Sequence, residues 1–120
     1  MNALRGATSY AAGLAAEEIV ARIYADIGAH EIARRWRGHS GEIDLILEQE
    51  DQIVFAEVKK SKSFSRAAEA LSSHQIERIY NAGGEFLASQ PKGQLTPCRF
   101  DLAVVDGVGA VRLIHNAFIF

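Results

Sequence analysis

The sequence has 120 residues, of which 48% are hydrophobic and 23% are charged, and its net charge is −2. This length and hydrophobic content predict one folded domain with a sizeable core and argue against intrinsic disorder. The slightly acidic balance excludes a global positive field that would attract nucleic acid, so any such contact needs a local basic patch.

Cys98 is the only cysteine, which excludes an internal disulfide and is typical of a reducing compartment. We interpret it as a small buried apolar residue. No apolar run approaches the ~20 residues of a membrane-spanning helix. The N-terminal stretch also lacks the long apolar region and cleavage site of a signal peptide. We therefore expect a cytoplasmic protein that does not enter a membrane.

Two helical segments stand out along the chain. Apolar residues recur with helical spacing over residues 8–27, and Gly28 is a natural stop. A later helical segment restarts at Ser72, where Gln75 three residues on completes the form of a capping box, and it runs to about residue 88.

Five β-like segments predict the strands, which are residues 31–37, 41–48, 53–59, 98–105 and 110–118. The second and third strands form a hairpin whose loop is Gln49–Gln52, and "SKSFS" (residues 61–65) is a further loop. No repeat or linker divides the chain. The order of elements predicts one α/β domain with a mixed sheet flanked by helices.

The hairpin register decides where the charges of its two strands lie. Residues that face each other share one side of the sheet, and these pairs are Glu48 with Ile53, Ile46 with Phe55, Asp44 with Glu57, and Glu42 with Lys59. The other side is then wholly apolar, with Ile43, Leu45, Leu47, Val54, Ala56 and Val58. A slip of one residue would scatter the charges over both sides, so the pattern predicts this register.

Two carboxylates side by side on paired strands repel each other, by roughly 0.2–1 kcal/mol. A hard divalent cation between Asp44 and Glu57 would offset this, because Mg²⁺ takes one or two carboxylates and keeps waters for a phosphate. Lys59 would then orient or deprotonate an attacking water, or balance charge on a phosphoryl transition state. The alternative is a solvated face on which Glu42 pairs with Lys59 and Asp44 points to water.

"GEIDLI" and "FAEVKK" resemble the Asp…Glu-x-Lys core of the PD-(D/E)XK nuclease superfamily and, more narrowly, the YraN-like family of small uncharacterised bacterial proteins. Three further segments, spread over nearly the whole chain, are similar to that family: "GLAAE", "CRFDLAVV" and "NAF". The resemblance implies a restriction-endonuclease-like α/β fold, with a mixed sheet between helices and a metal site at one end of the sheet.

The resemblance also implies roles for particular residues. Asp44 and Glu57 would bind Mg²⁺ or Mn²⁺, and Lys59 would be the catalytic lysine. Glu17 would be the acidic metal ligand from the first helix. The family has Thr and a basic residue after this lysine, where Lys60 and Ser61 stand here, which puts the role of that hydroxyl in doubt.

Glu42 and Gln75 are accessory candidates for the site. Some nucleases of this fold place a Gln on the helix after the lysine strand, with a Tyr four residues on. Here Tyr80 is five residues after Gln75, so we favour the capping role and keep a site role as the alternative.

Basic residues flank the hairpin in sequence. Arg35 and Arg37 precede it around Trp36, and Lys60 and Lys62 follow it. We expect these four cations to contact a nucleic-acid backbone. Trp36 either stacks on a base or packs in the core, and we favour the core.

We expect a metal-dependent nuclease that acts on nucleic acid, with DNA favoured over RNA, through Asp44, Glu57 and Lys59. One alternative is a non-catalytic nucleic-acid-binding module. Another is an assembly protein that uses the apolar C-terminal segment "LIHNAFIF", whose edge would also serve for a homodimer. The four histidines, including His39 near the hairpin, show no metal-ligand spacing, and Asp101 receives no role.

Overall fold

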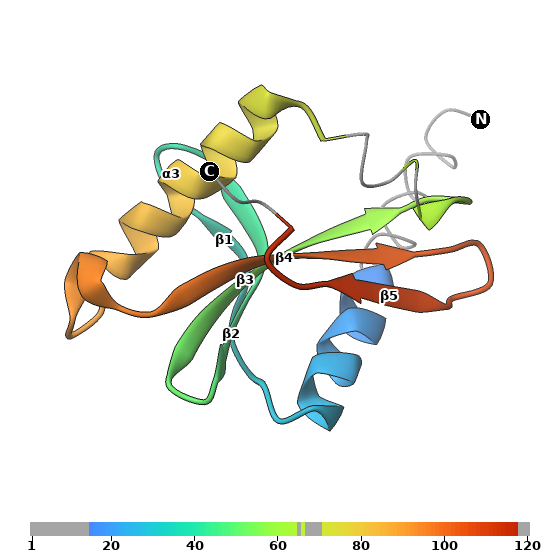
Figure 1. Cartoon of the computed structure of the whole chain (residues 1–120), viewed down its shortest axis with the longest axis horizontal. Coiled ribbons are helices and arrows are strands. Elements are labelled where there is room, and N and C mark those ends of the chain that lie inside the picture. The colour runs from blue at the N-terminus through green and yellow to red at the C-terminus, as the bar shows by residue number, and fades with distance from the viewer. Residues whose placement is uncertain (1–14, 65, 67–70, 118–120) are drawn as a thin grey trace.

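The structure, a computed structural model, describes residues 15–64, 66 and 71–117. One sheet contains five strands, ordered as in the chain: β1 (His30–Arg37), β2 (Glu42–Gln49), β3 (Gln52–Lys60), β4 (Cys98–Val105) and β5 (Val111–Ile114). Neighbouring strands are antiparallel except β3 and β4, which are parallel. A parallel pair needs a crossover connection, and here it contains helix α3 (Ser73–Leu87) (Figure 1).

Helices cover both faces of the sheet (Figure 1). Within the described residues, a first helix over residues 15–26 packs on one face and α3 packs on the other. This is the predicted α/β architecture with a mixed sheet, and it is compatible with a restriction-endonuclease-like fold. No helix in the described part of the chain is both long and apolar enough to cross a membrane.

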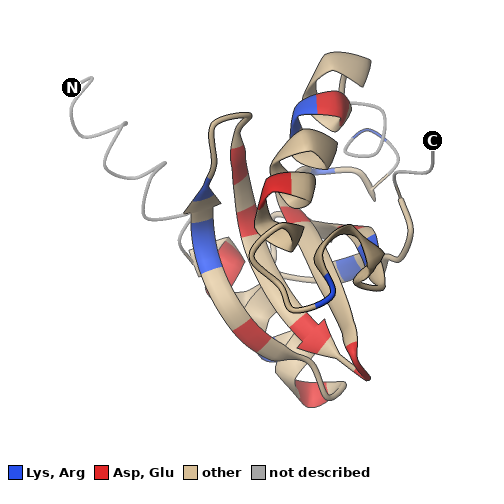
Figure 2. Ribbon diagram, turned by 90° about the vertical axis from the view of Figure 1, so that its left-hand side faces the viewer, with Lys and Arg blue, Asp and Glu red and all other residues tan. Residues whose placement is uncertain are grey.

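Charged residues are distributed over the strands, the first helix and α3 (Figure 2). Lys and Arg occupy short, separate stretches among Asp and Glu in this view. Among the described residues, five arginines pair with carboxylates: Arg22 with Glu18, Arg34 with Glu18 and Glu31, Arg35 with Glu17, Arg37 with Glu42, and Arg99 with Asp101. Most of the guanidinium charge is therefore compensated within the fold.

The helix ends follow their sequence signals. Gly28 ends the first helix with a φ of +87°, a left-handed conformation that glycine adopts at little steric cost. At α3, the Ser72 hydroxyl accepts a hydrogen bond from the Gln75 N–H at 3.1 Å, and Gln75 Oε1 accepts one from the Ser72 N–H at 3.0 Å. The predicted capping box is therefore confirmed. The expected start of the first helix at residue 8 lies outside the described residues.

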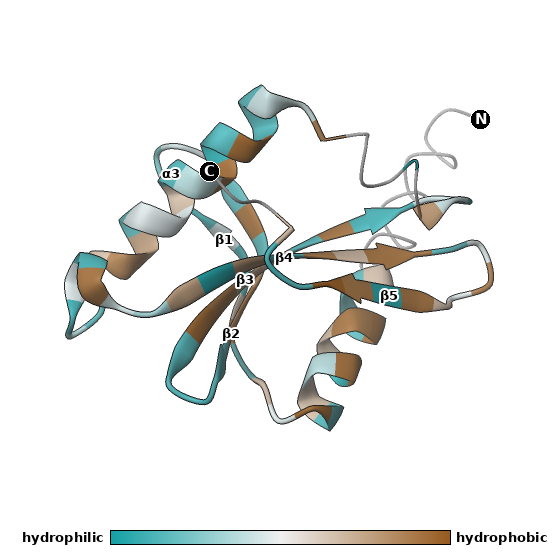
Figure 3. Cartoon of the chain, viewed as in Figure 1, coloured by the Kyte–Doolittle hydropathy of each residue, from teal (hydrophilic) through white to brown (hydrophobic). Residues whose placement is uncertain are grey.

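Apolar side chains form one cluster on each face of the sheet, and the strands and helix faces that carry them are the hydrophobic stretches of Figure 3. Under α3, Phe55 stacks on Phe100 with ring centroids 4.9 Å apart. Trp36 meets Phe86 edge-on at 5.6 Å, which confirms its packing against the core. Under the first helix, Val20 and Tyr24 pack on strand residues including Leu45, Leu47, Val54 and Ala56.

The hairpin turn is tighter than predicted. Gln49 and Gln52 pair with each other, so the loop is the two residues Glu50 and Asp51 instead of four. Both turn residues have positive φ, 50° and 64°, as the common two-residue hairpin turn requires. The register is unaffected, and the predicted pairs Glu48 with Ile53 and Ile46 with Phe55 are confirmed.

Partway along β1 and β2, the alternation of side chains between the two faces of the sheet is interrupted. Ile43 packs in the α3 cluster, whereas Leu45 packs under the first helix. The prediction that these two residues share one face is therefore wrong. Arg35 in β1 has a φ of 52°, and this left-handed residue breaks the two-residue alternation of its strand. Because Trp36 remains paired with Ile43, β2 follows the same change of direction.

Three local predictions also need correction. β5 is Val111–Ile114, shorter than the expected strand over residues 110–118. Phe64 is helical and not part of a loop, and its side chain packs against the α3 cluster. Cys98 is half-buried and not fully buried, and partial burial raises the pKa of its thiol.

Asp101 in β4 is fully buried and joins three parts of the chain. Its carboxylate accepts hydrogen bonds from the Tyr24 hydroxyl at 2.8 Å, from Arg99 Nε at 3.1 Å and from the Asn116 N–H at 3.2 Å. The His115 Nδ1 atom lies 2.9 Å from the same group. A buried charge needs such partners, so Asp101 has a structural role in linking the first helix to the segment after β5.

Candidate active site

Asp44 of β2 and Glu57 of β3 lie side by side where the two strands separate. The ladder between these strands has its last pair at Leu45 and Ala56. Beyond it, the Asp44 carboxylate accepts a hydrogen bond of 2.8 Å from the Val58 N–H, and the Asp44 N–H donates one of 3.3 Å to Glu57 Oε1. The predicted proximity of Asp44 and Glu57 is confirmed, although side-chain hydrogen bonds replace the expected ladder pair.

The environment of Glu57 strongly disfavours its charged form. Burial, then the charge of Asp44 and a hydrogen bond with the Asp44 side chain, raise the pKa of Glu57 from 4.5 to about 9, while the positive charge of Lys59 acts in the opposite direction. Two neighbouring carboxylates in low dielectric do not both ionise unless a positive charge compensates them. At neutral pH the pair without a cation therefore retains a proton.

The alternative of a solvated polar face is wrong for these strands. Glu57 is only 8% exposed, and the Asp44 carboxylate is bound to backbone. Glu42 pairs with Arg37 at 3.1 Å, within the β1–β2 hairpin, and not with Lys59.

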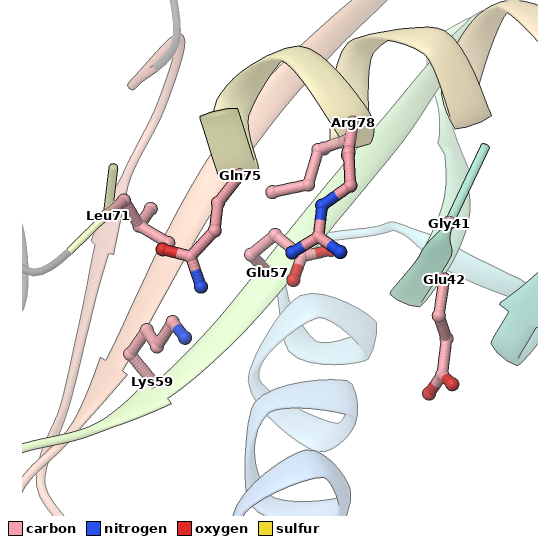
Figure 4. Close-up of a pocket in the computed structure, with 8 residues that line it drawn as sticks. Gly41, Glu42, Glu57, Lys59, Leu71, Gln75 and Arg78 are labelled. Atoms are coloured by element: carbon pink, nitrogen blue, oxygen red, sulfur yellow. The ribbon is translucent and has the colours of Figure 1, made fainter. Parts of the chain in front are cut away.

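A cavity of about 210 Å³ opens over Glu57 (Figure 4). Three parts of the chain line it: the start of β2, the end of β3, and α3 with the residue before its cap. The lining residues are Gly41, Glu42, Glu57, Lys59, Leu71, Gln75, Arg78 and Ile79. Lys59 therefore shares one cavity with Glu57, as the hairpin register predicts. The cavity lies at the carboxyl end of β3, the end at which ligands commonly bind next to parallel strands.

Gln75 forms the predicted capping box and also lines the cavity, while its accessory role in a catalytic site stays a prediction. Its Oε1 atom belongs to the capping box with Ser72, and its side chain also lines the cavity. In Figure 4 the amide nitrogen of Gln75 points toward the side of the cavity that holds Lys59.

Hydrogen bonds connect the loop between β1 and β2 to α3, and this contact positions one wall of the cavity. Glu85 of α3 accepts hydrogen bonds from the Ser40 hydroxyl at 3.1 Å and from the Ser40 N–H at 3.4 Å. A Cβ at Gly38 would collide with the Glu85 carboxylate, and a Cβ at Gly41 would lie 3.7 Å from Arg78 Cβ. Gly38 thus permits the loop to approach α3 closely, whereas a Cβ at Gly41 would make an ordinary van der Waals contact.

Glu17 is buried on the first helix, with 5% of its surface exposed. Its carboxylate forms an ion pair of 3.0 Å with Arg35 Nε. In the part of the chain that the structure describes, no group of three or more His, Cys, Asp or Glu side chains is arranged to hold a metal ion. The described metal-ligand candidates that lie together are therefore Asp44 and Glu57, and the expected role of Glu17 as a third ligand stays a prediction.

The four basic residues expected to contact nucleic acid divide into two groups. Arg35 and Arg37 are paired with Glu17 and Glu42. Lys60 and Lys62 are exposed and line a second cavity of about 230 Å³ beside the turn between β4 and β5.

Arg78 also lines the cavity and was not predicted as a site residue from the sequence. It lies on α3 three residues after Gln75, a spacing that places both side chains on one side of the helix. In Figure 4 it extends from α3 toward the Glu57 carboxyl group. The three-residue spacing from Gln75 indicates that the two side chains share one face of a helix. That this face borders the cavity becomes clear only from the position of α3 over the end of β3.

Comparison with known proteins places the chain in a family. The profile of the Uncharacterised protein family UPF0102 matches residues 16–105. A UPF0102 protein of Cereibacter sphaeroides is 56% identical over 115 residues, which cover 96% of this chain and 98% of that protein. A UPF0102 protein of Ruegeria pomeroyi is 53% identical and covers 97% of this chain and 94% of its own length. One from Roseobacter denitrificans is 52% identical, with 93% and 87% covered.

These matches include the segments of Asp44, Glu57, Lys59, Gln75 and Arg78, and they confirm the resemblance to the YraN-like family. The chain belongs to the protein family UPF0102.

Proposed function

We propose that this protein is a metal-dependent nuclease that hydrolyses phosphodiester bonds at the cavity over Glu57. The observation that carries the proposal is the contact between Asp44 and Glu57 at the end of β3, with Lys59 in the same cavity as Glu57. Maintaining such a pair is costly without a positive charge, and an enzyme site is where such arrangements are expected.

The donor set fits Mg²⁺ or Mn²⁺. Mg²⁺ uses one or two carboxylates and fills its remaining positions with water and substrate phosphate, and the cavity provides room for both. When bound, such a cation would polarise the phosphoryl group of the substrate and make a water bound to it more acidic. Asp44 and Glu57 would hold it from two different strands.

Lys59 would act on the substrate from the other side of the cavity. Its ammonium group has three donors and no acceptor, so it can orient the attacking water and stabilise negative charge on the phosphoryl oxygens. In the reaction, the water oxygen forms a bond to phosphorus, the bond to the leaving sugar oxygen breaks, and one proton passes from the water to the leaving group.

The test is cleavage of an end-labelled panel of single-stranded, duplex and branched DNA and of RNA, with Mg²⁺, Mn²⁺ or chelator. Asp44→Asn should lower the rate by at least about 100-fold, since loss of a direct ligand exceeds the 10–100-fold effects of residues behind the ligands. Lys59→Met should lower the rate while cation binding persists.

Lys92→Met is the matched control for Lys59→Met, because Lys92 lines a different cavity, beside the β2–β3 turn. It should cleave like the wild type. Equal cleavage by wild type and Asp44→Asn would reveal a contaminant and contradict the proposal. Binding of nucleic acid without cleavage under any condition would favour a non-catalytic binding module.

A further inference from the structure

Three side chains with hydrogen-bond donors line the cavity next to Glu57. Lys59 enters from β3, and Arg78 and Gln75 enter from α3 (Figure 4). Glu42, the other acidic lining residue, is already paired with Arg37, and in Figure 4 its carboxylate points away from this group.

Arg78 differs from the five arginines that pair with carboxylates. Among the described residues it forms no ion pair and no side-chain hydrogen bond, although it borders a cavity that contains Glu57. A guanidinium group presents its donors in a planar fork that matches two oxygens of a phosphate or carboxylate. Here the fork is left available for a ligand.

Gln75 adds donors of fixed orientation. Its Oε1 atom accepts from the Ser72 N–H, and a backbone N–H can be satisfied only by the oxygen of the amide. The capping box therefore settles the direction of the amide group, and the NH₂ end faces the cavity. Lys59, Gln75 and Arg78 together present only donors to this side of the cavity.

The size of the cavity limits what these donors can bind. Pockets for drug-sized ligands have volumes of about 300–1,000 Å³, whereas this cavity has about 210 Å³. It can admit a small anionic group but not a whole nucleotide with its base. A phosphate group carried by a strand that continues outside the cavity satisfies both the charge and the volume.

We propose that Arg78, with the Gln75 amide and Lys59, forms a subsite for one phosphate group of the nucleic-acid strand, next to the carboxylate pair. Only the assignment of this phosphate to a nucleic-acid strand rests on the proposed nuclease function. Arg78 then determines substrate affinity and the position of the strand, and the carboxylate pair serves the chemical step.

The experiment measures binding apart from cleavage. The probes are thymidine 3′,5′-bisphosphate and a short fluorescent single-stranded DNA, both in chelator, with dissociation constants obtained by calorimetry and anisotropy. Arg78→Gln should raise both dissociation constants at least about 10-fold, because it removes a charge-assisted contact that can be bidentate. The slope of log K against log salt should fall by about one.

Two further variants complete the design. Arg78→Lys keeps the charge but loses the fork, so it should bind with intermediate affinity. Lys92→Gln removes the same charge from another exposed residue, at a different cavity, and should stay within about 2-fold of the wild type. Thermal melts identify any variant that is not folded, and Arg78→Lys then replaces Arg78→Gln.

The outcomes separate this inference from the nuclease proposal. If Arg78→Gln and Arg78→Lys bind both probes as the wild type does, the phosphate subsite is wrong even where the wild type cleaves. The same holds if the wild type binds no bisphosphate at about 10 mM, a concentration at which even weak sites fill. If Arg78→Gln weakens binding but no cation supports cleavage, the subsite stands and the nuclease proposal falls.

Discussion

The carboxylate of Asp44 accepts a hydrogen bond of 2.8 Å from the backbone N–H of Val58. Beyond the last ladder pair of β2 and β3, this bond takes the place of a backbone carbonyl from the neighbouring strand. Asp44 is thus both part of the sheet and half of the carboxylate pair, and a substitution at this position has a structural effect and a chemical effect.

Asp44→Asn and Asp44→Ala separate these two effects. Asn keeps an oxygen for the Val58 N–H and removes the negative charge that helps to raise the pKa of Glu57, so the free energy of unfolding should be unchanged or higher. Ala leaves that N–H without its partner and should lower the free energy of unfolding by about 1–3 kcal/mol. Both variants should lose cation binding. Chemical denaturation of the two variants in chelator measures the difference, and equal stability would show that the Val58 bond contributes little.

Cation binding should release a proton and tighten as the pH rises. The pKa of Glu57 is raised to about 9 in the cation-free protein, so a cation that binds at pH 7 must displace the proton that the pair retains. The apparent affinity should increase by up to about tenfold per pH unit between pH 6 and 9, because one proton competes with the cation. Calorimetry with Mn²⁺ in buffers of different ionisation enthalpy counts the protons.

The control for this pH dependence is Glu57→Gln, which removes the titrating group. Its weak residual binding should change little over the same pH range. A wild type that binds Mn²⁺ without proton release would contradict the assignment of the raised pKa to this pair.

Two adjacent glycines of α3 should respond oppositely to alanine. A Cβ at Gly83 would lie 2.8 Å from Phe100 Cζ, whereas a Cβ at Gly84 would meet its first neighbour at 3.8 Å. Gly83→Ala should therefore lower the free energy of unfolding by about 1–3 kcal/mol, since overpacking outweighs the gain in helix propensity. Gly84→Ala should raise it by up to about 1 kcal/mol. Denaturant melts of both variants test this, and equal effects would show that α3 adapts at Gly83.

Substitution of Asp101 should destabilise the protein far more than substitution of an exposed acidic residue. Its carboxylate is fully buried and compensated by Arg99, so Asp101→Ala would leave the Arg99 charge, which is largely buried, without its partner. Such a change costs about 3–5 kcal/mol. Glu18→Gln also breaks arginine contacts, but at the surface, and should change the melting temperature little. Similar melting temperatures for the two variants would contradict the structural role of Asp101.

The features of the fold that depend on local pattern were predictable from the sequence. The alternation in "GEIDLILEQ" and "QIVFAEVKK" fixed the hairpin register, because any slip would have placed charges on the apolar face. Gly28 and the capping box of Ser72 and Gln75 marked helix ends by chemistry that acts within a few residues.

The features that depend on distant contacts were not predictable in this way. The changed facing of Ile43 follows from a positive φ at Arg35. The residues around Arg35 in the sequence give no signal of that conformation. The ion pair of Glu17 with Arg35 and the approach of Arg78 to Glu57 need the first helix and α3 placed on the sheet. The proximity of Asp44 and Glu57 was predictable because the two residues lie on strands joined by a short turn, so the hairpin register alone brings them together.

The proposed function depends on a divalent-cation site formed by Asp44 and Glu57. The most direct measurement is a titration of the folded protein with Mn²⁺, followed by electron paramagnetic resonance of the free ion, at pH 8 for the wild type, Asp44→Asn and Glu57→Gln. We expect one site in the wild type whose dissociation constant rises at least about 100-fold in either variant. Equal binding by all three proteins, or no binding by the wild type at millimolar Mn²⁺, would contradict it.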